Sequence, residues 1–254
     1  MGQQPVLFVS SLRKAYACTT AVHDISFAVR QGEVVGLLGP NGAGKTTTLN
    51  MILGILSPDN GQVIIDGLDI ATHRIQALER INFSAVYASL PGNLTVEQNL
   101  RIFGMLYGVR NLTARMNELI VRYGLEKFRK TRCGVLSSGE QTRASLAKAM
   151  INAPRLLLLD EPTASLDPAA ARDIRAGIKE YTANGGCALW TSHNMQEVEA
   201  VCDRVLFLSQ GRIVLEGNPA DLPRAHGADN LEELFIRVAK EPLHAATTER
   251  HACT

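Results

Sequence analysis

The sequence predicts an α/β fold with buried parallel strands at its centre, and three observations carry this prediction. Residues 33–38 form a short, mostly apolar run that leads into a glycine-rich stretch. Residues 155–160 contain four consecutive leucines soon after Pro154, in a run too short for a lone helix and too apolar for an edge strand. Residues 167–191 have the pattern of a helix followed by an apolar strand, which completes a β-α-β unit.

The N-terminal part of the chain is predicted to be rich in strands. Residues 5–36 have the pattern of short apolar strands, with turns near Gly32 and at residues 16–20. The dipeptide Asn60-Gly61 predicts a hairpin-type turn before a strand over residues 62–66. We therefore expect an antiparallel β-layer to precede and flank the parallel core.

A glycine-rich run joins the predicted strand at residues 33–38 to a predicted helix over residues 46–56. It matches the pattern G-x-x-x-x-G-K-[ST] and consists of Gly39, Pro40, Asn41, Gly42, Ala43, Gly44, Lys45, Thr46 and Thr47. Glycines let backbone N–H groups turn towards phosphate oxygens, and the following helix points its positive dipole end at the same anion. Lys45 would reach the β- and γ-phosphates of a nucleoside triphosphate, and Thr46 would offer its hydroxyl to Mg²⁺.

The middle of the chain is predicted to be helical. From about residue 94 to residue 149 the apolar residues have helical spacing, and Thr95-x-x-Gln98 has the pattern of a capping box. We expect a helical insert here. Further on, Asp167-Pro168 predicts a helix start, residues 184–186 (Asn-Gly-Gly) predict its stop, and residues 187–191 predict the next strand.

The composition excludes some classes of protein. The 26 Lys and Arg against 25 Asp and Glu give a formal charge of +1, so no overall field favours nucleic acid or an anionic membrane surface. We find no apolar run approaching the ~18 residues that span a bilayer, no signal peptide and no lipidation motif. The five cysteines are odd in number and lack C-x-x-C spacing, so reduced structural thiols are expected. The polar segment 241–254 is expected to be a frayed tail.

Two adjacent carboxylates, Asp160 and Glu161, end the leucine-rich strand. Ligands of open α/β folds bind at this edge of the sheet, and a buried acid pair without a role there would be costly. Asp160 is expected to hold the Mg²⁺ shell, partly through water. Glu161 is expected to polarise or deprotonate a water in line with the γ-phosphate.

Three short runs follow one another along the chain, at residues 159–163 (Leu-Asp-Glu-Pro-Thr), 164–167 (Ala-Ser-Leu-Asp) and 191–193 (Thr-Ser-His). In these runs and their order the chain resembles the ATP-binding subunits of ABC transporters. The resemblance covers about residues 6–235. It implies that His193 contacts the γ-phosphate and orients the water, and that Asp167 lies in a loop touching a partner subunit.

The family's LSGGQ signature corresponds here to Leu136 followed by Ser137, Ser138, Gly139 and Glu140. By resemblance these residues bind the γ-phosphate of a nucleotide held by a second subunit. Ser137-x-x-Glu140 also has the pattern of a capping box, so these residues can simply begin a helix, and both interpretations can hold. Ser138 and Glu140 replace Gly and Gln, for which we expect a modest cost in affinity. Tyr16 matches the family's aromatic residue that stacks on adenine, although it can also simply fill a strand.

One departure concerns a glutamine that ligates Mg²⁺ in the family and links to the membrane partner. Val86 occupies the best-aligned position, and valine cannot ligate a metal. Ser84 could substitute if the register shifts, or water could complete the shell. We expect hydrolysis to require Mg²⁺ with Thr46 and Asp160.

The resemblance implies a single domain with a RecA-like P-loop NTPase core, an N-terminal antiparallel β-layer and an inserted helical subdomain. The core would comprise about residues 5–81 and 151–217, the helical signature subdomain about 82–150, and the C-terminal helix and tail 218–254. The implied activity is ATP hydrolysis by a homodimer that sandwiches two ATP molecules and drives a separate membrane permease from the cytoplasmic face. The segment 231–235 and the short chain after it resemble the exporter branch, for a drug-like compound, lipid or glycan.

Two other classes of function remain open from the sequence. One is an ATPase of the same superfamily that acts in DNA repair or translation. The near-neutral charge and the single cassette argue against it. The other is a module that senses ATP with little turnover. Val86 and Glu140 make it conceivable, whereas the intact Glu161 and His193 argue against it.

Overall fold

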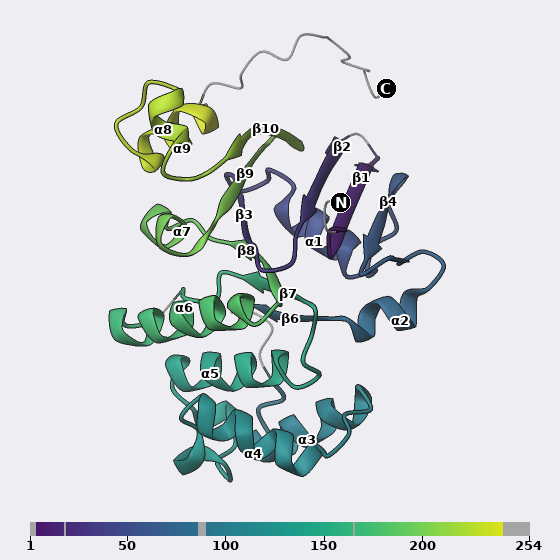
Figure 1. Ribbon diagram of the computed structural model, residues 1–254, viewed down its shortest axis with the longest axis vertical. Coiled ribbons are helices and arrows are strands. Elements are labelled where there is room, and N and C mark those ends of the chain that lie inside the picture. Colours follow the sequence, from purple (N-terminus) through teal and green to yellow (C-terminus); the bar gives the residue numbers. More distant parts are fainter. Residues whose placement is uncertain (1–3, 18, 86–89, 165, 241–254) are drawn as a thin grey trace.

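The computed structural model describes residues 4–17, 19–85, 90–164 and 166–240. Its centre is a six-stranded sheet in the order β10-β9-β3-β8-β7-β6 (Figure 1). The bounds are β3 Val34–Leu38, β6 Ile81–Ala85, β7 Leu156–Asp160, β8 Cys187–Thr191, β9 Arg204–Ser209 and β10 Arg212–Gly217. All pairs are parallel except β9 with β10, which is antiparallel.

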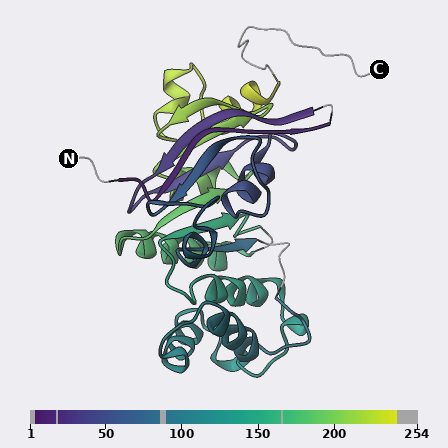
Figure 2. The same ribbon diagram turned by 90° about the vertical axis from the view of Figure 1, so that its right-hand side faces the viewer.

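A four-stranded antiparallel sheet in the order β2-β1-β4-β5 forms a second layer. Its strands are β1 Leu7–Tyr16, β2 Thr19–Val29, β4 Asn60–Ile65 and β5 Leu68–Asp69. The expected N-terminal β-layer is therefore present, with two strands longer than the short ones predicted. Figure 2 shows this layer crossing the molecule on the side of α1, Lys45–Ile52.

The central sheet separates two hydrophobic cores, because successive side chains of a strand point to opposite faces. On β7, Leu156 and Leu158 pack with the antiparallel layer and α1, whereas Leu157 and Leu159 pack with the helices. All four leucines are fully buried. This two-sided burial explains why the strand has no polar alternation, and it confirms the predicted parallel strand.

The helices on the other face form one layer near the sheet and a group at one end of the molecule (Figure 1). That group is α3 Val96–Leu106, α4 Leu112–Arg122 and α5 Ser138–Ala149, with short 3₁₀ turns at Glu126–Phe128 and Cys133–Val135. The predicted capping box at the start of α3 is present, with Thr95 accepting from the Gln98 N–H and Gln98 accepting from the Thr95 N–H.

The remaining helices are α2 Arg74–Glu79, α6 Pro168–Ala183, α7 Met195–Val201, α8 Leu222–Ala225 and α9 Leu231–Lys240. Helix α6 begins after Asp167 and stops at Asn184, as predicted. Within the described ranges, no helix is both long and apolar enough to cross a membrane.

The structure corrects one predicted turn and extends the sheet. Asn60 and Gly61 are the first two residues of β4, and the reversal comes later, at Asp66 and Gly67, where φ is 48° and 81°. Gly61 has φ of 89°, and a Cβ there would lie 2.3 Å from the Ser11 carbonyl oxygen, beside a register shift in β1. Glycine at residue 61 therefore allows the positive φ and the close approach of β4 to β1.

Strand β6 pairs with β7 through residue 85, beyond the expected start of the helical insert near residue 82.

Candidate active site

The glycine-rich run forms the loop between β3 and α1. Gly44 caps α1 with φ of 105°, and a Cβ there would lie 2.5 Å from the Ala21 carbonyl oxygen. The loop is held from the other side as well, because the Gly211 N–H donates to the Ala43 carbonyl at 3.0 Å. Glycine at residue 44 thus leaves the first turn of α1 with no side chain in front of its N–H groups, which suits an anion.

Lys45 begins α1 and returns over the loop. Its Nζ donates to the Gly39 carbonyl at 2.6 Å and to the Pro40 carbonyl at 3.2 Å. Burial lowers the pKa of Lys45, while the charges of Glu161 and Asp160 oppose that shift. The cation of the phosphate loop and the acid pair therefore interact through their charges.

Asp160 and Glu161 lie where β7 ends beside β8. Thr191, opposite Asp160 in the parallel register, donates its hydroxyl to Asp160 Oδ1 at 2.5 Å and accepts the Glu161 N–H at 3.1 Å. Glu161 has φ of 54°, in the left-handed region that bulky residues rarely adopt. This conformation ends the strand, so that the two neighbouring carboxylates need not follow its alternation. Backbone strain of this kind, about 1–3 kcal/mol, clusters at functional sites.

His193 follows β8 and meets Glu161. Its Nδ1 lies 2.5 Å from Glu161 Oε2, and 76% of its side chain is exposed against 21% for Glu161. With the Nδ1 proton directed at the carboxylate, Nε2 is left for another partner. Both residues line a cavity of about 460 Å³. The structure thus places His193 against Glu161, whose charge, like that of Asp160, acts on Lys45.

Ser137 and Glu140 form the capping box that the sequence indicated at the start of α5. The Ser137 side chain accepts from the Glu140 N–H at 3.4 Å, and Glu140 Oε2 accepts from the Ser137 N–H at 2.8 Å. Ser138 and Gly139 complete this turn and line, with Ser137 and Glu140, a groove of about 990 Å³ between α5 and α6. The described residues that line this groove include none of the phosphate loop.

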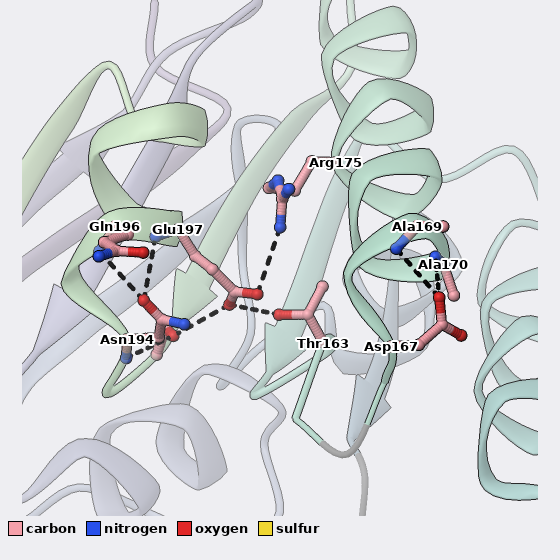
Figure 3. Close-up of polar contacts among 9 residues, drawn as sticks. Thr163, Asp167, Ala169, Ala170, Arg175, Asn194, Gln196 and Glu197 are labelled. Carbon is pink, nitrogen blue, oxygen red and sulfur yellow. Dashed lines mark hydrogen bonds and ion pairs between the residues drawn. The ribbon is translucent and has the colours of Figure 1, made fainter.

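Asp167 lies on the same groove. Its Oδ1 accepts from the N–H groups of Ala169 and Ala170, each at 3.0 Å, so that it caps α6 (Figure 3). Among the residues described, the single chain therefore gathers its signature residues and Asp167 on one groove and its phosphate loop and acid pair at another place.

Two further residues were considered from the sequence, Tyr16 as a contact to adenine and Ser84 as a metal ligand. Tyr16 ends β1 with 48% of its surface exposed, and the Lys14 Nζ lies over its ring at 6.0 Å from the centroid, so the adenine contact stays a prediction. Ser84, the substitute considered for a metal ligand, is only 3% exposed, and its hydroxyl is 3.0 Å from that of Ser145 on α5. That alternative is wrong for this structure, because the hydroxyl is buried against a helix. Val86 lies outside the described residues.

Sequence reasoning missed a buried polar cluster beside the Glu161–His193 pair, formed by Thr163, Arg175, Ser192 and Glu197. These residues come from four different segments. Thr163 and Ser192 belong to the runs at 159–163 and 191–193, but nothing in those runs indicates Arg175 or Glu197 as their partners. Thr191 could have been linked to Asp160 from the sequence, since both residues end predicted neighbouring strands.

The parallel sheet, the glycine loop at the head of α1 and the acid pair at the end of the next strand but one define a P-loop nucleoside triphosphatase. The comparisons give the family. The family model described as "ABC transporter" matches residues 22–164, more than half of the chain. The protein therefore belongs to the ABC transporter family, as an ATP-binding subunit with ATPase activity.

Individual relatives agree with this assignment. The chain is 39% identical to Nod factor export ATP-binding protein I of Ralstonia nicotianae, over 87% of this chain and 70% of that protein. It is 34% identical to linearmycin resistance ATP-binding protein LnrL of Bacillus subtilis, over 91% and 75% respectively. Among solved structures, an ATP-binding subunit of an ABC transporter matches with a TM-score of 0.83 and 29% identity, over 92% of this chain and 99% of the other.

Proposed function

We propose that two copies of this chain bind and hydrolyse Mg·ATP and thereby power a separate membrane permease that exports a drug-like compound, lipid or glycan. The observation that carries the hydrolytic part is the 2.5 Å contact between Glu161 and His193 within reach of the Lys45 charge. Export is supported by the relatives, whose names describe Nod factor export and linearmycin resistance.

In the proposed mechanism, Lys45 and the N–H groups of the loop hold the β- and γ-phosphates. Glu161 accepts a proton from the attacking water, and His193, oriented through Nδ1, directs Nε2 to the γ-phosphate. Tyr16 would stack on the adenine. Each side chain then acts on charge or position and none forms a covalent intermediate, as is usual for phosphoryl transfer.

The donor types of Thr46, in the first turn of α1, and Asp160, at the end of β7, fit Mg²⁺. Thr46 and Asp160 would hold it, with a hydroxyl and a carboxylate as hard oxygen ligands and phosphate oxygens and water completing the shell. Asp160 has its Oδ1 engaged by Thr191, which leaves Oδ2 for the ion. Across the described residues no group of three His, Cys, Asp or Glu side chains could hold a metal, so a site shared with the nucleotide fits better than an all-protein one. The ion would neutralise charge on the phosphates.

The separation of the two parts of the site supports a homodimer. The groove with Ser137, Gly139 and Asp167 is lined by none of the described phosphate-loop residues, so a second copy would bring it onto the γ-phosphate. Closure on ATP and release after hydrolysis would then follow from different affinities for the two nucleotides. The permease would hold this pair at the cytoplasmic face of the membrane.

The test compares ATP turnover of the wild-type chain with Glu161→Gln. We expect kcat to fall by about 10²–10⁴-fold, as for loss of a general base, with ATP affinity changed less than about threefold. Equal turnover would refute the role of Glu161. In the same variant, ATP with Mg²⁺ should convert monomers to dimers in size-exclusion chromatography and ADP should not.

Coupling to transport needs its own measurement. The tagged chain, purified in detergent from its own cells, should bring down a polytopic membrane protein whose cargo stimulates the ATPase. Deletion of the gene should raise the cellular level of that cargo. Association with ribosomes or nucleic acid in place of a polytopic protein would contradict the proposal.

A further inference from the structure

Glu197 on α7 is a mostly buried carboxylate beside the candidate active site. Its side chain is 12% exposed and lines the same cavity of about 460 Å³ as Glu161 and His193. It belongs to none of the sequence patterns discussed above. Buried carboxylates are retained only where their surroundings satisfy them, so its contacts indicate what it does.

The carboxylate joins three segments of the chain (Figure 3). Oε2 accepts a short hydrogen bond from the Thr163 hydroxyl, in the loop after Glu161, and one from the Ser192 hydroxyl at 3.4 Å. Oε1 lies 3.4 Å from Arg175 Nη1 on α6. All three partners donate in this arrangement, and the two oxygens of one carboxylate accept from all of them together.

The two hydroxyl partners flank the residues that carry the proposed chemistry. Thr163 lies two residues after Glu161, and Ser192 directly precedes His193. Ser192 is fixed further because its hydroxyl accepts the Asn194 N–H at 3.0 Å. Glu197 therefore links the loop of Glu161 to the loop of His193, in addition to the 2.5 Å contact between those two residues.

We propose that Glu197 is a positioning residue that sets the distance between Glu161 and His193 and thereby the rate of the hydrolytic step. The inference rests on the proposed roles of these two residues. It assigns Glu197 no contact with the nucleotide: it acts through the two loops. A misplacement of catalytic groups by about 1 Å can lower the rate about 10²-fold. Weakening the hydrogen bonds of Glu197 to the two loops should therefore have a measurable effect.

The first test is Glu197→Gln, which keeps the shape of the side chain but removes the negative charge beside Arg175 and leaves one acceptor oxygen in place of two. We expect kcat for ATP to fall about tenfold, with KM within about twofold because the phosphate loop is untouched. Glu199→Gln, at an exposed position of the same helix, makes the same change in charge and should keep kcat within about twofold. Equal kcat for Glu197→Gln and the wild type would overturn the inference.

The second test changes Thr163, the donor of the short hydrogen bond to Glu197. Thr163 is 5% exposed, and Thr163→Val removes the hydroxyl while keeping the shape. We expect Thr163→Val to lower kcat like Glu197→Gln and Thr163→Ser, which keeps the donor, to retain most of it. If Thr163 has a purely structural role, Thr163→Val should keep more kcat than Thr163→Ser, or the loss of kcat should be accompanied by a lower thermal stability and a changed KM.

A third measurement separates this inference from the proposed function. If the wild-type chain hydrolyses no ATP, the proposed function fails, and amide hydrogen exchange decides the role of Glu197. Exchange at residues 161–164 and 192–196 should be about tenfold faster in Glu197→Gln than in Glu199→Gln, with the phosphate loop unchanged. Unchanged exchange at both loops would refute the claim that Glu197 holds them together.

Discussion

Lys148 is a partly buried lysine whose positive charge the fold disfavours. It lies in the last turn of α5, and its Nζ donates to the Phe83 carbonyl on β6 at 2.6 Å and lies 5.4 Å from the Phe103 ring centroid. Burial lowers its pKa from 10.5 to about 8. We predict that replacing Lys148 by methionine changes the pH dependence of stability.

The magnitude follows from proton linkage. Below pH 8 the amine is protonated in both the folded and the unfolded chain, so it contributes no pH dependence. Between pH 8 and 10.5 the unfolded chain holds the proton and the folded chain has released it, so the free energy of unfolding rises with pH. At 1.36 kcal/mol per pKa unit, the wild type gains about 2–3 kcal/mol relative to Lys148→Met between pH 7 and pH 10.

Urea unfolding at several pH values, followed by the fluorescence of the single, fully buried Trp190, measures this difference. Subtracting the curve of Lys148→Met removes the contributions of the other titrating groups. Lys130→Met makes the same change at an exposed position and is the matched control. A wild-type minus Lys148→Met difference that stays within about 0.5 kcal/mol from pH 7 to pH 10 would refute the reasoning.

Two further predictions concern the site. Gly44→Ala should destabilise the fold by about 2–4 kcal/mol in thermal or urea unfolding, because it combines φ of 105° with a Cβ 2.5 Å from the Ala21 oxygen. Gly42→Ala has φ of 80° but no atom within 4 Å of the new Cβ, and should cost only about 1 kcal/mol; equal losses would contradict this account. Thr191→Val removes the 2.5 Å hydrogen bond to Asp160, so the Mg²⁺ concentration for half-maximal ATPase should rise about tenfold, and an unchanged Mg²⁺ curve would count against it.

Features with a strong local cause were predictable from the sequence. The loop around Lys45 needs residue types that few other structures require in that order, and Asp167 followed by a proline begins a helix in most contexts. The leucines of β7 indicated burial on both faces. The closeness of Lys45 to the acid pair was also expected, since both follow parallel strands of one sheet.

Features that depend on distant segments were not predictable in this way. Asn60-Gly61 has the composition of a hairpin turn, but the neighbouring strand β1 determines that Gly61 serves a close contact instead. The Glu197 cluster joins residues 5 to 34 positions apart, so nothing near any one of them in the sequence indicates its partners. Only the packing of α6 and α7 on the sheet brings them together.

The attachment of α5 has a mechanical consequence. Its C-terminal half is bonded to β6 through Lys148 and Ser145, whereas its N-terminus at Ser137 faces the open groove. A helix of 12 residues is about 18 Å long, so a tilt of about 10° about the bonded end would displace the other end by roughly 3 Å. A displacement of that size equals the length of a hydrogen bond, so a small rotation at the edge of the sheet is enough to engage or disengage Ser137 from any anion it meets.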